Sequence, residues 1–159
     1  METVQNYKEK AIGLFLEGYN CCQAVFAACC GRFGLGEADG LRLTAGMGGG
    51  MGGLREKCGA VTAMFLLAGL RDGNYAPEDA DAKNAMYTLV RELDSAFTER
   101  CGSTCCRELL EEAECSFSNV PNMRDDAYYA SRPCATLVGI AAEIAMNCLL
   151  TPPADEKEA

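Results

Sequence analysis

This chain of 159 residues is long enough for one domain of ordinary size, and its 49% of hydrophobic residues can fill a substantial core. Its 14 basic and 23 acidic residues give a net charge of −9, which excludes the basic surface needed to bind nucleic acid or an anionic membrane. The sequence has no apolar run of membrane-spanning length and begins without the features of a secretory signal, so we expect a cytoplasmic protein.

Hydrophobic periodicity predicts helices along most of the chain, whereas polar and β-branched residues nowhere alternate as they do in a strand. In chain order, Gly18 is expected to end the first helix, Asn20 to cap the second, Gly102 to end the longest and Pro133 to open the last. The predicted helices span residues 4–17, 21–33, 37–45, 55–70, 78–101, 103–115 and 134–150.

The remaining stretches are short, apart from residues 116–131, which we expect to be irregular. No internal repeat and no linker divides the chain. The sequence therefore predicts one all-α domain over residues 1–151, a bundle of about five to seven helices with short loops, and a disordered tail over residues 152–159.

The chain contains no histidine, which excludes Ser-His and Cys-His catalytic pairs, histidine-ligated zinc and haem attached through CxxCH. Cysteine is left as the obvious residue to carry chemistry, and there are eleven of them, an odd number that cannot pair completely within the chain. No C-x-x-C occurs, so the thioredoxin-type dithiol and the common zinc knuckle are both missing.

Four of the cysteines each stand at the start of a different predicted helix. The unpaired N–H groups and the dipole at a helix N-terminus stabilise a thiolate, so this placement indicates a shared thiolate site. The four are Cys21, Cys58, Cys106 and Cys134. The other seven are interpreted mainly as small buried hydrophobes, because free cysteine often packs in that way. They are Cys22, Cys29, Cys30, Cys101, Cys105, Cys115 and Cys148.

A glycine-rich run, GMGGGMGG at residues 46–53, precedes Cys58. We predict that it lets backbone N–H groups approach a centre held by Cys58 and tune it by hydrogen bonds to sulfur; the alternative is a close crossing of helices with no ligand. The positive charges of Arg55 and Lys57 make Cys58 the most thiolate-like residue of the chain in this interpretation. The predicted cofactor-binding glycines are Gly49, Gly50, Gly52 and Gly53.

From about residue 7 to residue 150, the sequence resembles the redox-active family named for its C_GCAxxG_C_C cysteine pattern. The resemblance is carried by NCCQAV at 20–25, AGMGGGMGGLREKCGAVTA at 45–63, CRELL at 106–110 and CATLVGIAAEI at 134–144. The family's cysteines map onto Cys21, Cys58, Cys106 and Cys134. Ala63 stands where the family pattern ends in Gly, and the extra cysteines are a second departure. The resemblance implies a helical domain with a redox or metal-cluster role, and a related domain in split-Soret-type cytochromes implies iron–sulfur binding.

Three hypotheses follow. The first is a four-thiolate metal centre held by the four cysteines, an iron–sulfur cluster of the [2Fe–2S] type with zinc as the second option, which serves electron transfer or redox sensing with an unidentified redox partner protein. The second is metal-free thiol–disulfide chemistry, as an enzyme or a sensor, with Cys58 and Cys21 as reacting groups. The third is a structural or partner-binding helical domain with inert thiols. Whether the protein is an enzyme stays open, and a homodimer is one option for its assembly.

Overall fold

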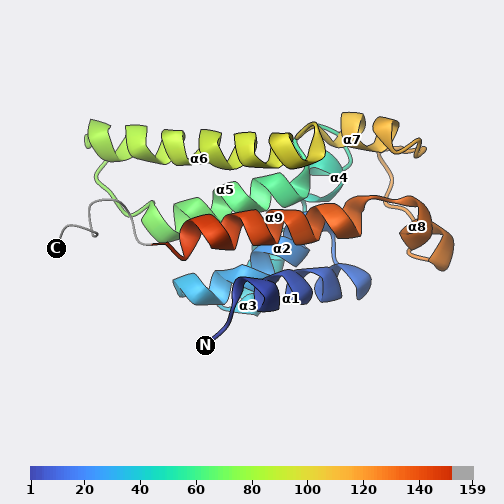
Figure 1. Cartoon of the computed structure of the whole chain (residues 1–159), viewed down its shortest axis with the longest axis horizontal. Coiled ribbons are helices and arrows are strands. Elements are labelled where there is room, and N and C mark those ends of the chain that lie inside the picture. The colour runs from blue at the N-terminus through green and yellow to red at the C-terminus, as the bar shows by residue number, and fades with distance from the viewer. Residues whose placement is uncertain (152–159) are drawn as a thin grey trace.

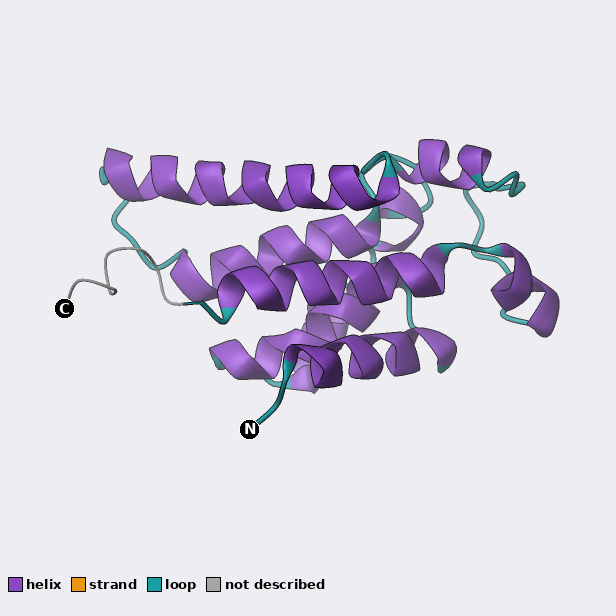
Figure 2. Cartoon of the chain, viewed as in Figure 1, coloured by secondary structure: helices purple, strands orange, loops and turns teal. Residues whose placement is uncertain are grey.

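The computed structural model describes residues 1–151, and every regular element within them is a helix (Figures 1 and 2). The elements are α1 (Val4–Leu16), α2 (Cys21–Cys29), the 3₁₀ helix η1 (Cys30–Phe33), α3 (Glu37–Leu43), α4 (Gly48–Met51), α5 (Gly59–Asp72), α6 (Ala80–Cys101), α7 (Cys106–Glu112), α8 (Asp126–Ser131) and α9 (Cys134–Leu149). Seven of these α-helices have at least seven residues, which confirms the predicted all-α fold. The tail predicted over residues 152–159 lies outside the described residues.

The helices form layers around α5 and α9, with α6 along one side and α1 and α2 along the other (Figure 1). Small side chains allow this close packing, since Ala24, Ala60 and Ala141 are fully buried between the layers. At Gly139 of α9 a Cβ would lie 2.8 Å from Ile12 Cδ1 of α1, so these two helices meet where α9 has no side chain. Within residues 1–151, the helices are too short or too polar to cross a membrane.

Most predicted helix ends coincide with the observed ones, because local caps and breakers set them. Asn20 caps α2 in a capping box with Gln23, and Gly102 ends α6 in the left-handed conformation with φ +87°. The prediction of an irregular stretch over residues 116–131 is wrong at its end, where Asp125 caps the short helix α8 by accepting from the N–H of Tyr128.

Helix α5 begins at Gly59 rather than at residue 55, because the residues before it pair with another part of the chain. The N–H of Cys58 donates to Thr104 O at 2.7 Å, and the N–H of Cys106 donates to Glu56 O at 2.6 Å. A single antiparallel bridge joins Lys57 and Cys105 at this place. This pairing satisfies backbone groups that would otherwise belong to helix ends, and it fixes the start of α5 beside the start of α7.

The glycine-rich run forms a left-handed turn. Gly49, Gly50, Met51 and Gly52 have φ values of +62°, +64°, +72° and +57°. Side chains disfavour this conformation by about 1–2 kcal/mol per residue, which explains why three of these four positions are glycine. The turn closes through hydrogen bonds from the N–H groups of residues 55 and 56 to the carbonyls of residues 49 and 50, and it leads the chain directly into the paired segment before α5.

Candidate functional site

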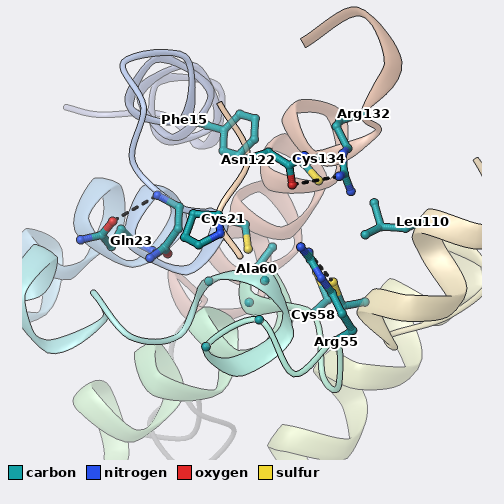
Figure 3. Close-up of a pocket in the computed structure, with 18 of the residues that line it drawn as sticks. Phe15, Cys21, Gln23, Arg55, Cys58, Ala60, Leu110, Asn122, Arg132 and Cys134 are labelled. Atoms are coloured by element: carbon teal, nitrogen blue, oxygen red, sulfur yellow. Dashed lines mark hydrogen bonds between the residues drawn. The ribbon is translucent and has the colours of Figure 1, made fainter. Parts of the chain in front are cut away.

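Four helices begin at one cavity of about 440 Å³, and each contributes a cysteine to its wall (Figure 3). Cys21, Cys106 and Cys134 are the first residues of α2, α7 and α9, and Cys58 is the residue that precedes α5. The structure therefore brings together the four cysteines singled out from the sequence, although Cys21 and Cys134 lie 113 positions apart in the chain. Long-range packing of the helices creates this arrangement.

The other cysteines do not line this cavity. Cys22, next to Cys21, is fully buried in the hydrophobic core, as are Cys29 and Cys30. The thiol of Cys105, next to Cys106, donates instead to the carbonyl of Arg55 at 3.7 Å. In each adjacent pair at the cavity, helix geometry thus turns one sulfur toward the cavity and the other away.

The thiol of Cys21 lies against Gly59, the first residue of α5. A Cβ at Gly59 would be only 2.6 Å from Cys21 Sγ, so α5 can approach this sulfur only with glycine at its first position. Burial raises the pKa of Cys21, and the neighbouring Cys106 raises it further, whereas the backbone N–H groups of Gly49 and Gly59 act in the opposite direction. The backbone N–H groups of the glycine-rich run and of the start of α5 therefore both favour the thiolate form of Cys21.

The expectation that Cys58 is the most thiolate-like residue is wrong. Burial, reinforced by the nearby Cys21, raises the pKa of Cys58 well above its ordinary value. Lys57 points away from it, because its Nζ bonds to Asp94 Oδ1 and Thr104 Oγ1, each at 2.8 Å. Arg55, labelled in Figure 3, does reach a cavity cysteine, because its Nη1 donates to Cys106 Sγ at 3.7 Å.

The predicted cofactor-binding glycines divide into two groups. Gly49, Gly52 and Gly53 line the cavity, whereas Gly50 does not. A Cβ at Gly50 would lie 2.6 Å from Cys106 Cβ and 2.7 Å from Glu56 N, so this glycine is buried beneath the paired segment and serves packing. The backbone N–H of Gly49 acts on Cys21, whereas the N–H groups that act on Cys58 belong to Ala60 and Val61 of α5. Cofactor binding by the run stays a prediction.

Sequence reasoning missed the positive charge of the cavity. Arg55, Arg124 and Arg132 line it, and no aspartate or glutamate of residues 1–151 does, although acidic residues outnumber basic ones in the chain. The segment at residues 119–124 completes the wall, and the carbonyl of Ser118 accepts from Arg55 Nε at 3.0 Å and from Nη2 at 2.7 Å. The sequence does contain a signal for this positive charge, because Arg55 lies three residues before Cys58 and Arg132 lies two residues before Cys134.

The cysteines surround a shared space without forming a finished site for one ion. Within residues 1–151, no three Cys, Asp or Glu side chains are arranged to hold a metal ion. Burial, reinforced by the nearby Cys21 and Cys106, nevertheless raises the pKa of Cys134 to about 12, so these sulfurs are near enough to influence one another. Metal binding by the four cysteines stays a prediction.

The fold and the cavity define a class of small, all-helical, cysteine-rich proteins with a thiol site at the meeting point of several helices. Over residues 19–148 the chain matches the family described as "Putative redox-active protein (C_GCAxxG_C_C)", and it belongs to this family. No curated protein and no solved structure matches the chain. The family description gives a redox role and names no cofactor.

Proposed function

We propose that the protein holds an iron–sulfur cluster through Cys21, Cys58, Cys106 and Cys134 and uses it for electron transfer or redox sensing. The observation that carries this proposal is the convergence of four cysteines, and of no other residue type with comparable metal affinity, on one cavity. Thiolate sulfur is the usual ligand of iron–sulfur clusters. Membership of a redox-active family supports a redox role for these thiols.

A cluster fits the residues better than zinc does. A single zinc ion needs four ligands at about 2.3 Å, and no three candidate ligands are arranged for one ion within residues 1–151. A cluster spreads its ligands over a larger core, which suits cysteines placed around a cavity of about 440 Å³. When bound, the cluster would supply one-electron chemistry, as a [2Fe–2S] centre does.

This chain's own residues would shape such a centre. The N–H groups of Gly49 and Gly59 would donate to Cys21 sulfur, and Arg55 would donate to Cys106 sulfur. Hydrogen bonds and positive charge near ligating sulfurs raise the reduction potential of a cluster. The partner would be a redox protein, and a reducing compartment such as the cytoplasm would keep the remaining thiols reduced.

Metal-free thiol–disulfide chemistry is the second candidate, with Cys58 and Cys21 as the reacting pair. Among the charged groups that affect the pKa of Cys58, Cys21 has the largest effect, which indicates that the two sulfurs are neighbours. Burial raises the pKa of both thiols, however, and a thiol that holds its proton is a weak nucleophile. A bound metal deprotonates the thiols that ligate it, whereas a metal-free pair lacks that help, so the arrangement favours a ligand role over an attacking role.

The test is the iron and acid-labile sulfide content of protein purified without oxygen, together with its visible absorption. We expect a coloured protein, and we expect Cys58→Ser and Cys106→Ser to lower the iron content to less than about a tenth. Cys115→Ser is the matched control, because Cys115 lies outside the cavity and its thiol donates to Ser131 O at 3.1 Å, a bond that serine can keep.

Two results would reject the cluster. Colourless protein with one zinc per chain would replace it with a zinc site. Colourless, metal-free protein with a Cys21–Cys58 disulfide that forms and breaks reversibly would favour the second candidate. Equal loss of iron in the Cys115→Ser control would show that the cavity cysteines have no special role.

A further inference from the structure

The cysteine cavity concentrates positive charge in a strongly acidic protein. Arg55, Arg124 and Arg132 all line it, and no carboxylate from the described part of the chain does, although the full sequence carries a net charge of −9. All three arginines are half-buried, so water screens their charge less than it would on an open surface. Such a cavity attracts a negatively charged group.

None of these arginines forms an ion pair within residues 1–151. Neutral oxygen atoms hold them instead. Arg132 donates from Nη2 to Ser116 O at 2.8 Å and to Asn122 Oδ1 at 3.2 Å, as Figure 3 shows for Asn122. Arg124 donates to the carbonyls of Phe15 and Tyr19 at 3.3 and 3.2 Å. These bonds fix the guanidinium groups in place without neutralising them.

One aromatic ring orders two of the guanidinium groups. The ring centroid of Tyr128 lies 4.8 Å from Arg124 Cζ and 5.4 Å from Arg132 Cζ, and the ring centroid of Phe15 lies 4.4 Å from Arg124 Cζ. Stacking on aromatic rings leaves the edge of a guanidinium, which carries its N–H donors, free to bind. A guanidinium has five such donors, and the hydrogen bonds of Arg132 all come from Nη2, so those on Nε and Nη1 have no acceptor within residues 1–151.

We propose that this cavity binds a small anion of the carboxylate or oxyanion class, held by Arg132 and Arg124 beside the four cysteines. The planar fork of arginine matches the two oxygens of such a group. The cavity volume of about 440 Å³ falls in the range of about 300–1,000 Å³ that small-molecule sites occupy. The anion would be a substrate or an effector of the thiol centre.

The link between this anion site and the redox centre rests on the proposed function, whereas the anion site itself does not. Four thiolates around an oxidised [2Fe–2S] core leave a net charge of about −2. Three arginines exceed that by about one positive charge, which leaves room for a singly charged anion. Reduction adds one electron and removes the excess, so the anion would bind more tightly to the oxidised protein, and by linkage it would lower the reduction potential.

The experiment uses the metal-free, reduced, full-length protein, so that its result does not depend on a cluster. Binding of inorganic phosphate, sulfate and acetate is measured by titration calorimetry at constant ionic strength, with chloride as the balancing ion. We expect saturable binding by at least one of the three anions at one site per chain. Arg132→Gln should weaken it at least tenfold, since a hydrogen bond to a charged group contributes about 1.5–3 kcal/mol.

Arg42→Gln is the control, because Arg42 is exposed and forms an ion pair with Asp39, so this variant removes the same charge outside the cavity. We expect it to bind the anion as the unchanged protein does. Arg132→Lys keeps the charge without the fork, and its affinity should fall between those of Arg132→Gln and the unchanged protein. Circular dichroism checks that each variant is folded.

Absence of saturable binding by all three anions, or equal weakening by Arg42→Gln and Arg132→Gln, would overturn the proposal. So would binding that disappears when the oxidised centre is reconstituted, because the arginines would then serve only to neutralise that centre. Failure to incorporate iron would reject the proposed function and leave the anion measurement intact.

Discussion

Gly59 sets how closely the start of α5 approaches Cys21. Arg55 lacks the conformational freedom of glycine, yet it adopts a left-handed backbone conformation with φ +59°. Backbone strain of this kind costs about 1–2 kcal/mol and persists where surrounding contacts hold the residue in place. For Arg55 those contacts are Ser118 O and the sulfur of Cys106, so a strained residue lies directly at the candidate site.

Gly49 and Gly50 are neighbours with similar backbone angles and different surroundings, so they separate backbone strain from crowding. Alanine at Gly49 meets nothing nearer than Arg55 Nη1 at 3.5 Å, whereas at Gly50 it meets Cys106 Cβ at 2.6 Å and backbone at 2.7 Å. We expect Gly49→Ala to lower the free energy of unfolding by about 1–2 kcal/mol, and Gly50→Ala by about 2–5 kcal/mol. Urea unfolding measures both.

The control for these two variants is Gly31→Ala, which has open space around it and an ordinary backbone conformation. It should change the free energy of unfolding by no more than about 0.5 kcal/mol. Equal losses at Gly49 and Gly50 would mean that the crowding beneath Cys106 contributes nothing.

Helix starts place all four cavity cysteines, so caps matter beyond their own helices. Asn20 accepts from the N–H of Gln23 at 2.9 Å and donates from Nδ2 to Ala45 O at 3.0 Å. A Cβ at Gly48 would lie 2.5 Å from Asn20 Cβ, so the glycine-rich turn packs directly on this cap. One side chain thus joins the start of α2 to the segment that carries the glycines.

We expect Asn20→Ala to lower the free energy of unfolding by about 2 kcal/mol, because it removes both a cap and a long-range hydrogen bond. Asp79→Ala is the comparison: Asp79 caps α6 by accepting from the N–H of Ala82 at 3.0 Å, and its removal should cost about 1 kcal/mol. Chemical denaturation measures the difference. If both variants lose the same amount, the bond to Ala45 contributes no stability.

These elements also show why part of the molecule was predictable from sequence. Asn20 and Gly102 act on residues within four positions of themselves, so a local pattern reveals them. The start of α5 depends on pairing with residues near Cys106, about 50 positions away, and no local pattern encodes that. The direction of the Arg55 side chain also depends on this pairing, so the sequence places its charge beside Cys58 whereas the structure places it at Cys106.

The core of the whole protein contains thiols in place of some aliphatic side chains. Cys22, Cys29 and Cys30 are fully buried, and all three belong to the main hydrophobic cluster of the core. Burial, reinforced by the neighbouring Cys30, raises the pKa of Cys29 from 9.0 to about 12. Since the folded protein then keeps a proton that the unfolded chain releases, the fold itself becomes sensitive to alkaline pH.

The sign of this effect follows from proton linkage. Above about pH 9 the unfolded chain loses the Cys29 proton while the folded state retains it, so the free energy of unfolding falls as pH rises, by about 1.4 kcal/mol per pH unit for this thiol, until the folded pKa near 12 is reached. Below pH 8 the contribution is fully present.

Urea unfolding of reduced, metal-free protein at several pH values between 7.5 and about 10.5 measures the slope. Cys29→Ala should show a shallower slope than the unchanged protein above pH 9, whereas Val25→Ala, a truncation of another fully buried side chain in α2 that cannot titrate, should lower stability by a similar amount at every pH. Parallel slopes for the unchanged protein and Cys29→Ala would show that the buried thiol does not couple the fold to pH.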